Sequence, residues 1–213
     1  DELKHGDAVL TLGSDLAPAY KEVYFFGHRD AAASSVFNCI KAGGDELCLT
    51  PDHFLMVSDS GSWADAQAVR SGKIRVGQTV WQGAEDVKPA LVEAVTERFH
   101  KGLFNPYTLD NHIIVVDGLV ASTHSSWFLD DIVPESAAHF LPAIYEMALA
   151  PARSVYRLMG SEWVSDLQDR LPIDSAGREG LVQGYQVLLS QEFSALAQKA
   201  LGSLIPASLR SEL

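Results

Sequence analysis

The sequence is poor in the features that mark a disulfide scaffold, a nucleic-acid surface or a membrane span. Only 2 of its 213 residues are cysteine, too few for a disulfide framework. Lys and Arg (16) are outnumbered by Asp and Glu (28), and the formal charge of −12 argues against nucleic acid as a partner, because phosphate binding requires clustered positive charge. No apolar run reaches the roughly 18 residues of a transmembrane segment. With 47% hydrophobic residues, the chain can still bury one good core.

The two cysteines lie on either side of an expected hairpin turn. Ala42-Gly43-Gly44-Asp45 separates the strand-like runs Val36–Lys41 and Glu46–Thr50. If the turn centres on the two glycines, Cys39 and Cys48 face each other, with Cα atoms roughly 4.5–5.5 Å apart and within disulfide range. Two buried thiols are the more common state of such cysteines, and a disulfide is the alternative.

The chain changes character near residue 130. Before this point, short β-branched and aromatic runs separated by Gly and Asp turns are typical of an all-β unit. These runs are Ala8–Leu12, Glu22–Phe26, Val36–Lys41, Glu46–Thr50, Phe54–Ser58, Thr79–Gln82, Ala90–Thr96 and His112–Val116. Afterwards apolar residues recur at helical spacing, most clearly from Leu181 to Leu204, and prolines at 134, 142, 151 and 172 indicate several short helices before a long one. The sequence therefore predicts a β domain over residues 1–130 and a helical tail over residues 131–213.

The β half also contains a weak internal repeat. Gly6-Asp7-Ala8-Val9 returns as Gly77-Gln78-Thr79-Val80, and each copy is followed by a second strand-like run. Thr50–Val57 has a counterpart in Thr108–Val115, and each places a Thr and a His just before an apolar strand. Duplication of a β unit without an intervening helix predicts a pseudo-twofold β fold.

Thr50-Pro51-Asp52-His53 brings a hydroxyl and an imidazole together at a turn that enters a strand. Pro51 restricts Thr50 to extended geometry. An imidazole that titrates near neutral pH can protonate a leaving amine, and a neighbouring hydroxyl can orient the reacting amide. Taken alone, this spacing more often marks a structural histidine, so its interpretation depends on the surrounding motifs.

Those motifs together resemble a Hint domain, the self-cleaving module of hedgehog proteins and inteins, over the stretch from Gly6 to Asp130. The matching elements are the Gly6–Val9 strand, the Thr50–His53 turn and the final apolar strand that runs from Ile113 to Ser122-Thr123-His124. Tyr20–Val23 followed by Phe25–Asp30 is similar to the hedgehog strand that leads to its general base. Met147–Arg153 is similar to the hedgehog segment beyond the Hint core, so the resemblance to the hedgehog type is the nearer one.

The resemblance implies autoprocessing at the N-terminal side of the domain. A cysteine thiol converts the preceding peptide bond into a thioester, and the acyl group then passes to a lipid or sterol hydroxyl, another nucleophile or water. His53 would protonate the departing amine, and Thr50 would hold the scissile amide. His28 stands where animal hedgehog proteins carry an aspartate that activates the second nucleophile, and Asp30 could orient or replace it. The implied partner is the flanking N-terminal polypeptide, with no cofactor, in the secretory pathway or outside the cell.

Three departures from the family pattern limit this interpretation. The chain begins with the polar residues Asp1–His5, without a Met or a signal-peptide pattern, so we expect it to be a piece of a longer protein that carries the nucleophilic cysteine upstream. As it stands, the chain would be inactive in the first step. Thr123 occupies the position of a hedgehog cysteine, and no Asn follows His124, so we do not expect protein splicing.

Other functions remain as alternatives. A dedicated metal site is not expected, because no His-x-x-x-His or Cys-x-x-Cys pair occurs, although His28, His53 and His124 could converge and bind zinc adventitiously. A serine hydrolase would require a Gly-x-Ser-x-Gly motif, which is absent. The non-enzymatic alternative is an inactive Hint domain that serves as a binding or structural module, with the tail from Pro134 to Leu213 packing on the core or binding a lipid or partner.

Overall fold

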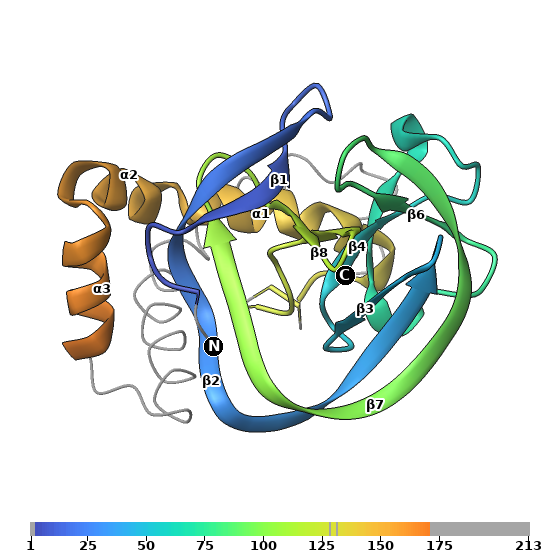
Figure 1. The fold of residues 1–213 in the computed structure, drawn as a ribbon, viewed down its shortest axis with the longest axis horizontal. Helices are drawn as coiled ribbons and strands as arrows, with labels where there is room; N and C mark the ends of the chain where they lie inside the picture. Colours follow the sequence, from blue (N-terminus) through green and yellow to red (C-terminus); the bar gives the residue numbers. More distant parts are fainter. Residues whose placement is uncertain (1–2, 128, 131, 171–213) are drawn as a thin grey trace. The chain divides into compact units, whose positions relative to one another are not determined.

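The computed structural model describes residues 3–127, 129–130 and 132–170, which are mainly β-strands followed by short helices (Figure 1). The strands are β1 (Ala8–Leu12), β2 (Pro18–Ala42), β3 (Asp45–Leu49), β4 (Phe54–Val57), β5 (Gln67–Arg70), β6 (Thr79–Gln82), β7 (Lys88–Thr108), β8 (Ile113–Val116) and β9 (Leu119–Ser122). The helices are the 3₁₀ turns η1 (Trp63–Asp65), η2 (Ser71–Lys73) and η3 (Glu135–Phe140), and the α-helices α1 (Leu141–Ala148), α2 (Ala150–Met159) and α3 (Ser161–Arg170). The predicted fold class, mainly β with a helical region after it, is confirmed.

Two long strands, β2 and β7, pair antiparallel along most of their length and bend together, as Figure 1 shows. The separate runs predicted at Glu22–Phe26 and Val36–Lys41 are parts of the single strand β2, so the prediction of several short strands was wrong here. The linking stretch is polar or small and mostly solvent-accessible, and its register shifts twice, between Phe26 and His28 and between Asp30 and Ser34. The alternation of hydrophobic residues in a sequence marks only the buried parts of a strand. In β2 the hydrogen-bonded ladder continues through bulges, which bend the strand and bury few side chains.

The predicted internal repeat is visible in the backbone. The sheet order runs β1-β2-β7-β6-β9-β4-β5, so a short strand flanks each member of the central β2–β7 pair. Gly6 and Gly77 both have positive φ, 86° and 90°, which glycine adopts without strain. Gly6 N donates to Val23 O and Gly77 N donates to Val92 O, each at 2.9 Å. The two halves therefore start with the same turn and the same crossing onto their long strand, as a pseudo-twofold fold requires.

The main core lies between the strands of the two halves. It is formed by aliphatic residues from β2, β3, β4, β6, β7, β8 and β9, among them Ile40, Leu47, Leu55, Val80, Val92 and Leu119. Strands β5 and β9 were not predicted as separate strands. Strand β9 pairs with β8, β6 and β4, and thereby joins the second half of the duplication to the first.

The hairpin between β2 and β3 has the predicted register, with Cys39 opposite Cys48. The two cysteines form a disulfide, with Cα atoms 3.9 Å apart. The expectation of two free thiols is therefore wrong. Directly facing residues of an antiparallel pair stand close enough for their sulfur atoms to bond, so the register permits either state and the redox environment decides between them.

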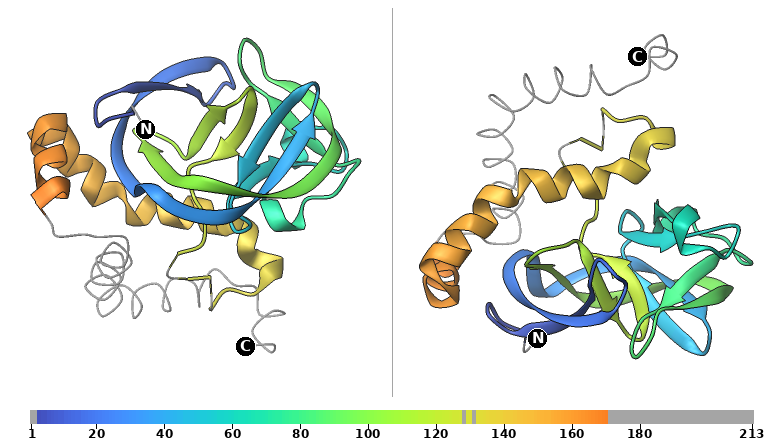
Figure 2. Two further views of the ribbon diagram at one scale, coloured as in Figure 1. Left: turned by 60° about the horizontal axis from the view of Figure 1, so that its bottom comes forward. Right: turned by 90° about the horizontal axis from the view of Figure 1, so that it is seen from above.

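The helices pack against the β domain through two mixed clusters. One joins Phe54 of β4 to Leu141 and Tyr145 of α1, and the other joins Tyr24 of β2 to Tyr156 of α2. Figure 2 shows α1 and α2 lying along one side of the strands. These contacts do not test the predicted domain boundary at residue 130, which stays a prediction.

Proline residues mark the helix starts as the sequence predicts. Pro142 and Pro151 lie in the first turns of α1 and α2, where a missing backbone N–H costs nothing. Pro172 and the long amphipathic segment from Leu181 to Leu204 lie outside the described residues. Among the helices that the structure describes, none has the length and hydropathy needed to cross a bilayer.

We expect the double substitution Cys39→Ala, Cys48→Ala to lower the free energy of unfolding by about 2–3 kcal/mol. The disulfide closes a loop of 9 residues in sequence separation, and its removal restores conformational freedom to the unfolded chain. Urea denaturation of both proteins at neutral pH measures the difference. Reduced wild-type protein serves as the control and should match the double variant, whereas a loss below about 1 kcal/mol would contradict the expectation.

Candidate functional site

The turn Thr50–His53 connects β3 to β4 and is held by the 3₁₀ turn η2. Within the turn, His53 N donates to Thr50 O at 3.0 Å. Ser71 Oγ donates to Thr50 O at 2.8 Å, and Ser71 N donates to His53 O at 2.7 Å. Gly72 N adds a third bond of 2.9 Å, to the carbonyl of the turn's proline. Ser71 is fully buried, so the backbone that carries Thr50 and His53 is fixed from one side.

The imidazole of His53 points to the end of β9. Its Nε2 atom lies 2.9 Å from the carbonyl oxygen of Ser122. Because a carbonyl oxygen can only accept, Nε2 carries the proton of the neutral ring and Nδ1 remains an acceptor. Phe54 N also donates to His124 O at 3.1 Å, so the turn and the segment after β9 are tied by two hydrogen bonds.

Burial is the largest cause of a change at His53 and lowers its pKa to about 4, although the residue as a whole keeps some exposed surface. The charges of His124 and His28 lower the pKa further, and the hydrogen bond to Ser122 opposes the shift. At neutral pH the ring is therefore uncharged. A neutral imidazole with an unprotonated Nδ1 can accept a proton from a nucleophile and pass it to a leaving group.

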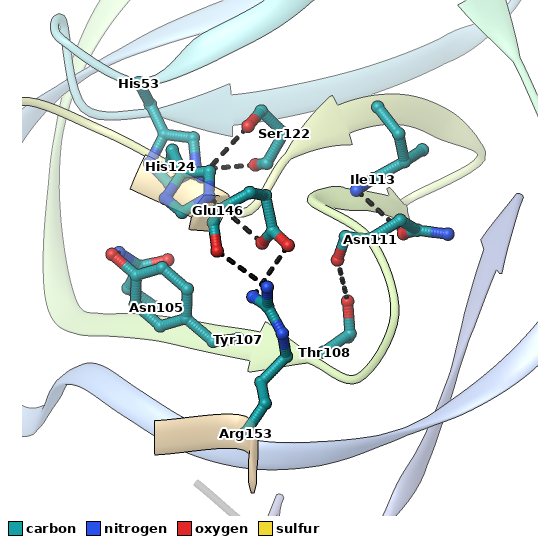
Figure 3. A network of polar contacts seen from close by, with 10 residues as sticks. All are labelled: His53, Asn105, Tyr107, Thr108, Asn111, Ile113, Ser122, His124, Glu146 and Arg153. Carbon is teal, nitrogen blue, oxygen red and sulfur yellow. Dashed lines mark hydrogen bonds and ion pairs between the residues drawn. The ribbon is translucent and has the colours of Figure 1, made fainter. Parts of the chain in front are cut away.

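His124 follows β9 and lies in a fully buried position (Figure 3). Its Nε2 atom is 3.2 Å from Glu146 Oε1 of α1, and Arg153 of α2 donates to the other carboxylate oxygen at 2.7 Å. Among the described residues, no hydrogen-bond partner is present for His124 Nδ1. Burial lowers the pKa of His124, and Glu146 opposes that shift. The ring is therefore a buried imidazole oriented by a carboxylate.

Aromatic rings surround His124. The ring centroids of Tyr107, Tyr145 and His112 lie 5.1, 5.8 and 6.0 Å from that of His124. Burial lowers the pKa of His112 to about 4, and the charge of His124 adds to this effect. The site is thus an enclosed group of neutral histidines in which an added positive charge is unfavourable.

Thr123 lies between Ser122, whose carbonyl oxygen is bonded to His53, and His124, which contacts Glu146. Its backbone N donates to His112 O at 2.7 Å, and the residue is 1% exposed. Within the described part of the chain, Thr123 Oγ1 has no hydrogen-bond partner. A buried hydroxyl without a partner costs roughly 1–3 kcal/mol and is a candidate contact for a reacting group.

The remaining predicted residues lie on β2. His28 is exposed, pairs with Asn105 of β7 across the ladder, and is close enough to His53 for its charge to affect the pKa of that ring. Asp30 Oδ1 accepts hydrogen bonds from the backbone amides of residues 32 and 33 at 2.8 and 3.0 Å, and so stabilises the bend of β2. The structure thus brings Thr50, His53, Thr123 and His124 to one place, with His28 at its edge, while the roles given to all of them stay predictions.

Four contributors were not predicted from the sequence. Ser71 acts through backbone and hydroxyl contacts that no motif marks, and Ser122, although it lies in a family motif, acts through its backbone carbonyl, which residue type does not reveal. Glu146 and Arg153 are seven residues apart, which is two helical turns, and this spacing is the signal that could have paired them. Pro151 begins a new helix between them, and that break hides the relation.

A potential metal-ligand group lies elsewhere in the described residues. One atom each of Cys39, Cys48 and His100 lie within 4.8 Å of one another. The two sulfur atoms are joined in the disulfide, and thiolates are the species that bind metals. The group therefore does not fit a metal site in this state.

Comparison with known proteins places these features in a family. A family model described as the Hint module matches residues 1–171. Warthog protein 6 of Caenorhabditis elegans is 27% identical over 134 residues, which cover 62% of this chain and 22% of that protein. The Indian hedgehog protein of Gallus gallus is 28% identical over 183 residues, which cover 79% of this chain and 42% of that protein. The chain thus spans less than half the length of either relative.

Solved intein structures are also similar to this chain. The solution structure of the DnaX mini intein from Spirulina platensis is 16% identical, with a TM-score of 0.44 over 54% of this chain and 80% of that one. A bacterial intein-like domain from Clostridium thermocellum is 21% identical, with a TM-score of 0.42 over 57% and 84% of the two chains.

We expect the free energy of unfolding to fall as the pH is lowered from 6.5 to 4. His53 and His112 have a pKa near 4 when folded and an ordinary value of 6.5 when unfolded, so the unfolded chain takes up protons first. The stabilisation by the neutral histidines is fully present above pH 6.5. Protonation of each histidine lowers the free energy of unfolding by on the order of 3 kcal/mol between pH 6.5 and 4. Urea denaturation at several pH values measures it.

The variant His112→Gln tests the assignment of this pH dependence. It should reduce the fall in stability, whereas His139→Gln on η3, a histidine in contact with Phe140, should leave the fall unchanged. A wild-type profile that is flat between pH 6.5 and 4, or equal profiles for all three proteins, would contradict the burial of neutral histidines.

Proposed function

The chain belongs to the Hint family, and on this premise we propose that it is the self-cleaving part of a longer precursor. The reaction cuts the peptide bond that joins the domain to the polypeptide on its N-terminal side. The observation that carries the proposal is the state of His53, a neutral imidazole whose Nε2 proton is held by Ser122 O and whose Nδ1 remains an acceptor. Thr50 lies three residues away on the same clamped turn.

The first step is an exchange of a C–N bond for a C–S bond. A cysteine thiol that precedes Asp1 in the precursor attacks the carbonyl carbon of the residue before it. His53 Nδ1 takes the thiol proton as the C–S bond forms, and then gives this proton to the amine as the C–N bond breaks. Cys39 and Cys48 are unsuitable as nucleophiles because both sulfurs are in the disulfide. The role proposed for Thr50 is to orient the scissile amide.

The second step transfers the acyl group from sulfur to an acceptor. The acceptor is a lipid or sterol hydroxyl, another nucleophile or water, and water gives simple hydrolysis. His28 is the proposed base where the acceptor is an external hydroxyl, because its exposed position on β2 can be reached by such an acceptor and its charge affects the pKa of His53. Asp30, two residues along the same strand, is the proposed residue that orients or replaces it.

The proposed place of action is the secretory pathway or the outside of the cell. Disulfides form and persist in oxidising compartments, and are rare where thiols are kept reduced. The bond between Cys39 and Cys48 supports an oxidising setting for this domain.

The decisive experiment uses the precursor, meaning this chain with its natural N-terminal flanking segment and a fluorescent reporter at the N-terminus. Hydroxylamine is the added nucleophile, because it cleaves thioesters and leaves the Cys39–Cys48 disulfide intact. We expect release of the reporter, and we expect His53→Ala to slow release by roughly 10²–10⁴-fold, the contribution of a positioned acid–base group. The matched control His139→Ala, on η3, should release at the wild-type rate.

Two outcomes would overturn the proposal. Release at the wild-type rate from His53→Ala would remove His53 from the chemistry. Absence of release from the folded wild-type precursor would favour the other function, a Hint domain that acts as a binding or structural module.

A further inference from the structure

The helices that follow the β domain place two charged side chains against His124. Glu146 belongs to the last turn of α1, and Arg153 to the first half of α2. Both are largely buried, with side chains 13% and 12% exposed. Burial of a carboxylate and a guanidinium costs more desolvation free energy than a surface ion pair does. Both groups therefore need well-placed hydrogen-bond partners.

Arg153 satisfies Glu146 in two ways. One guanidinium nitrogen donates to Glu146 Oε2 at 2.7 Å, and the other donates to the backbone oxygen of Glu146 at 2.6 Å. That oxygen belongs to the end of α1, where helix carbonyls lack partners within the helix. Arg153 therefore caps α1 and fixes the Glu146 carboxylate, and Figure 3 shows the carboxylate reaching His124.

Glu146 in turn determines the state of His124. The carboxylate oxygen accepts from Nε2, so the neutral ring of His124 carries its proton there and exposes a lone pair at Nδ1. The Nδ1 atom and the neighbouring Thr123 Oγ1 are both buried, and neither has a hydrogen-bond partner in the described residues. Two unsatisfied polar atoms on consecutive residues of the segment that also receives the hydrogen bond of His53 indicate the position of a reacting group.

We propose that Glu146, held by Arg153, is a positioning residue that makes His124 the base when water is the acyl acceptor, whereas His28 at the exposed edge serves an external hydroxyl. This inference rests on the proposed function. In this hydrolytic step, water attacks the thioester carbon and gives a proton to His124 Nδ1 as the C–O bond forms. The C–S bond breaks, and the cysteine thiolate takes the proton from His124. The helical region is thereby part of the active site.

Several ionisable groups face His124 and set its electrostatic environment. They are His53 from the β3–β4 turn, His112 before β8, Tyr107 of β7, Tyr145 and Glu146 of α1, and Arg153 of α2. Arg153 lowers the pKa of His124 and Glu146 raises it. Removal of the Glu146 charge should therefore lower the pKa of His124, and removal of the Arg153 charge should raise it. A purely packing role for the two residues would not produce opposite shifts.

The first test is NMR of the ¹⁵N-labelled histidine rings, using the chain as it stands. We expect wild-type His124 to be the Nε2-protonated tautomer at pH 7. Glu146→Gln should lower the pKa of His124, and Arg153→Gln should raise it. The matched control Glu162→Gln, an exposed carboxylate on α3, should change neither property. An Nδ1-protonated ring, or equal pKa values in all four proteins, overturns the proposal whatever the outcome of the cleavage assay.

The second test separates the two steps in the reporter precursor. Glu146→Gln should leave hydroxylamine-induced release within about twofold of wild type, because formation of the thioester does not use His124. Transfer to water, measured as release without added nucleophile, should slow by about tenfold or more, since base catalysis supplies roughly 10²–10⁴-fold. Equal losses in both rates would show a merely structural role and overturn the proposal. If Glu146→Gln does not fold, Arg153→Lys carries the same comparison, because it keeps the charge but loses the double contact with Glu146.

Discussion

The site depends on one hydrogen bond, from His53 Nε2 to the carbonyl oxygen of Ser122. It joins residues 69 positions apart in the sequence, and places the Thr50–His53 turn against the segment that contains Thr123 and His124. It also fixes which nitrogen of His53 carries the proton, and therefore which nitrogen is available for chemistry. The adjacent pairing of Leu55 with Ala121 extends the same junction into the sheet.

The duplicated architecture explains why these segments meet. Each half begins with a glycine of positive φ, crosses onto a long strand and returns through a turn that carries a Thr and a His. The two long strands pair antiparallel, and β9, which pairs with β8, β6 and β4, then brings the segment after the second copy against the Thr50–His53 turn. The copies have then diverged. In the first half the turn presents His53, whereas in the second Thr108 Oγ1 donates to Asn111 O, and the His112 carbonyl accepts from Thr123 N.

Sequence reasoning predicted the parts of this arrangement that depend on local pattern. The order of the motifs placed Thr50, His53 and the Ser122–His124 segment in one family pattern, and the glycine repeat indicated the pseudo-twofold fold. The length of β2 was missed because its middle is bent and polar, and hydrophobic alternation records burial only. The cysteine pair was placed correctly, but its oxidation state was not, since register limits distance and does not determine redox chemistry. The Glu146–Arg153 pair was missed because its meaning depends on His124, 22 residues away, and on how α1 packs.

The central claim, cleavage through a thioester formed with the help of His53, is tested most directly by the chemical identity of the released fragment. The precursor is incubated with hydroxylamine at neutral pH, and the mass of the N-terminal fragment is determined by mass spectrometry. The account predicts a hydroxamate at the C-terminus of that fragment, formed at the peptide bond before the upstream cysteine, and its loss in His53→Ala. A free carboxylate at that position in the presence of excess hydroxylamine, or cleavage at another bond, would contradict it.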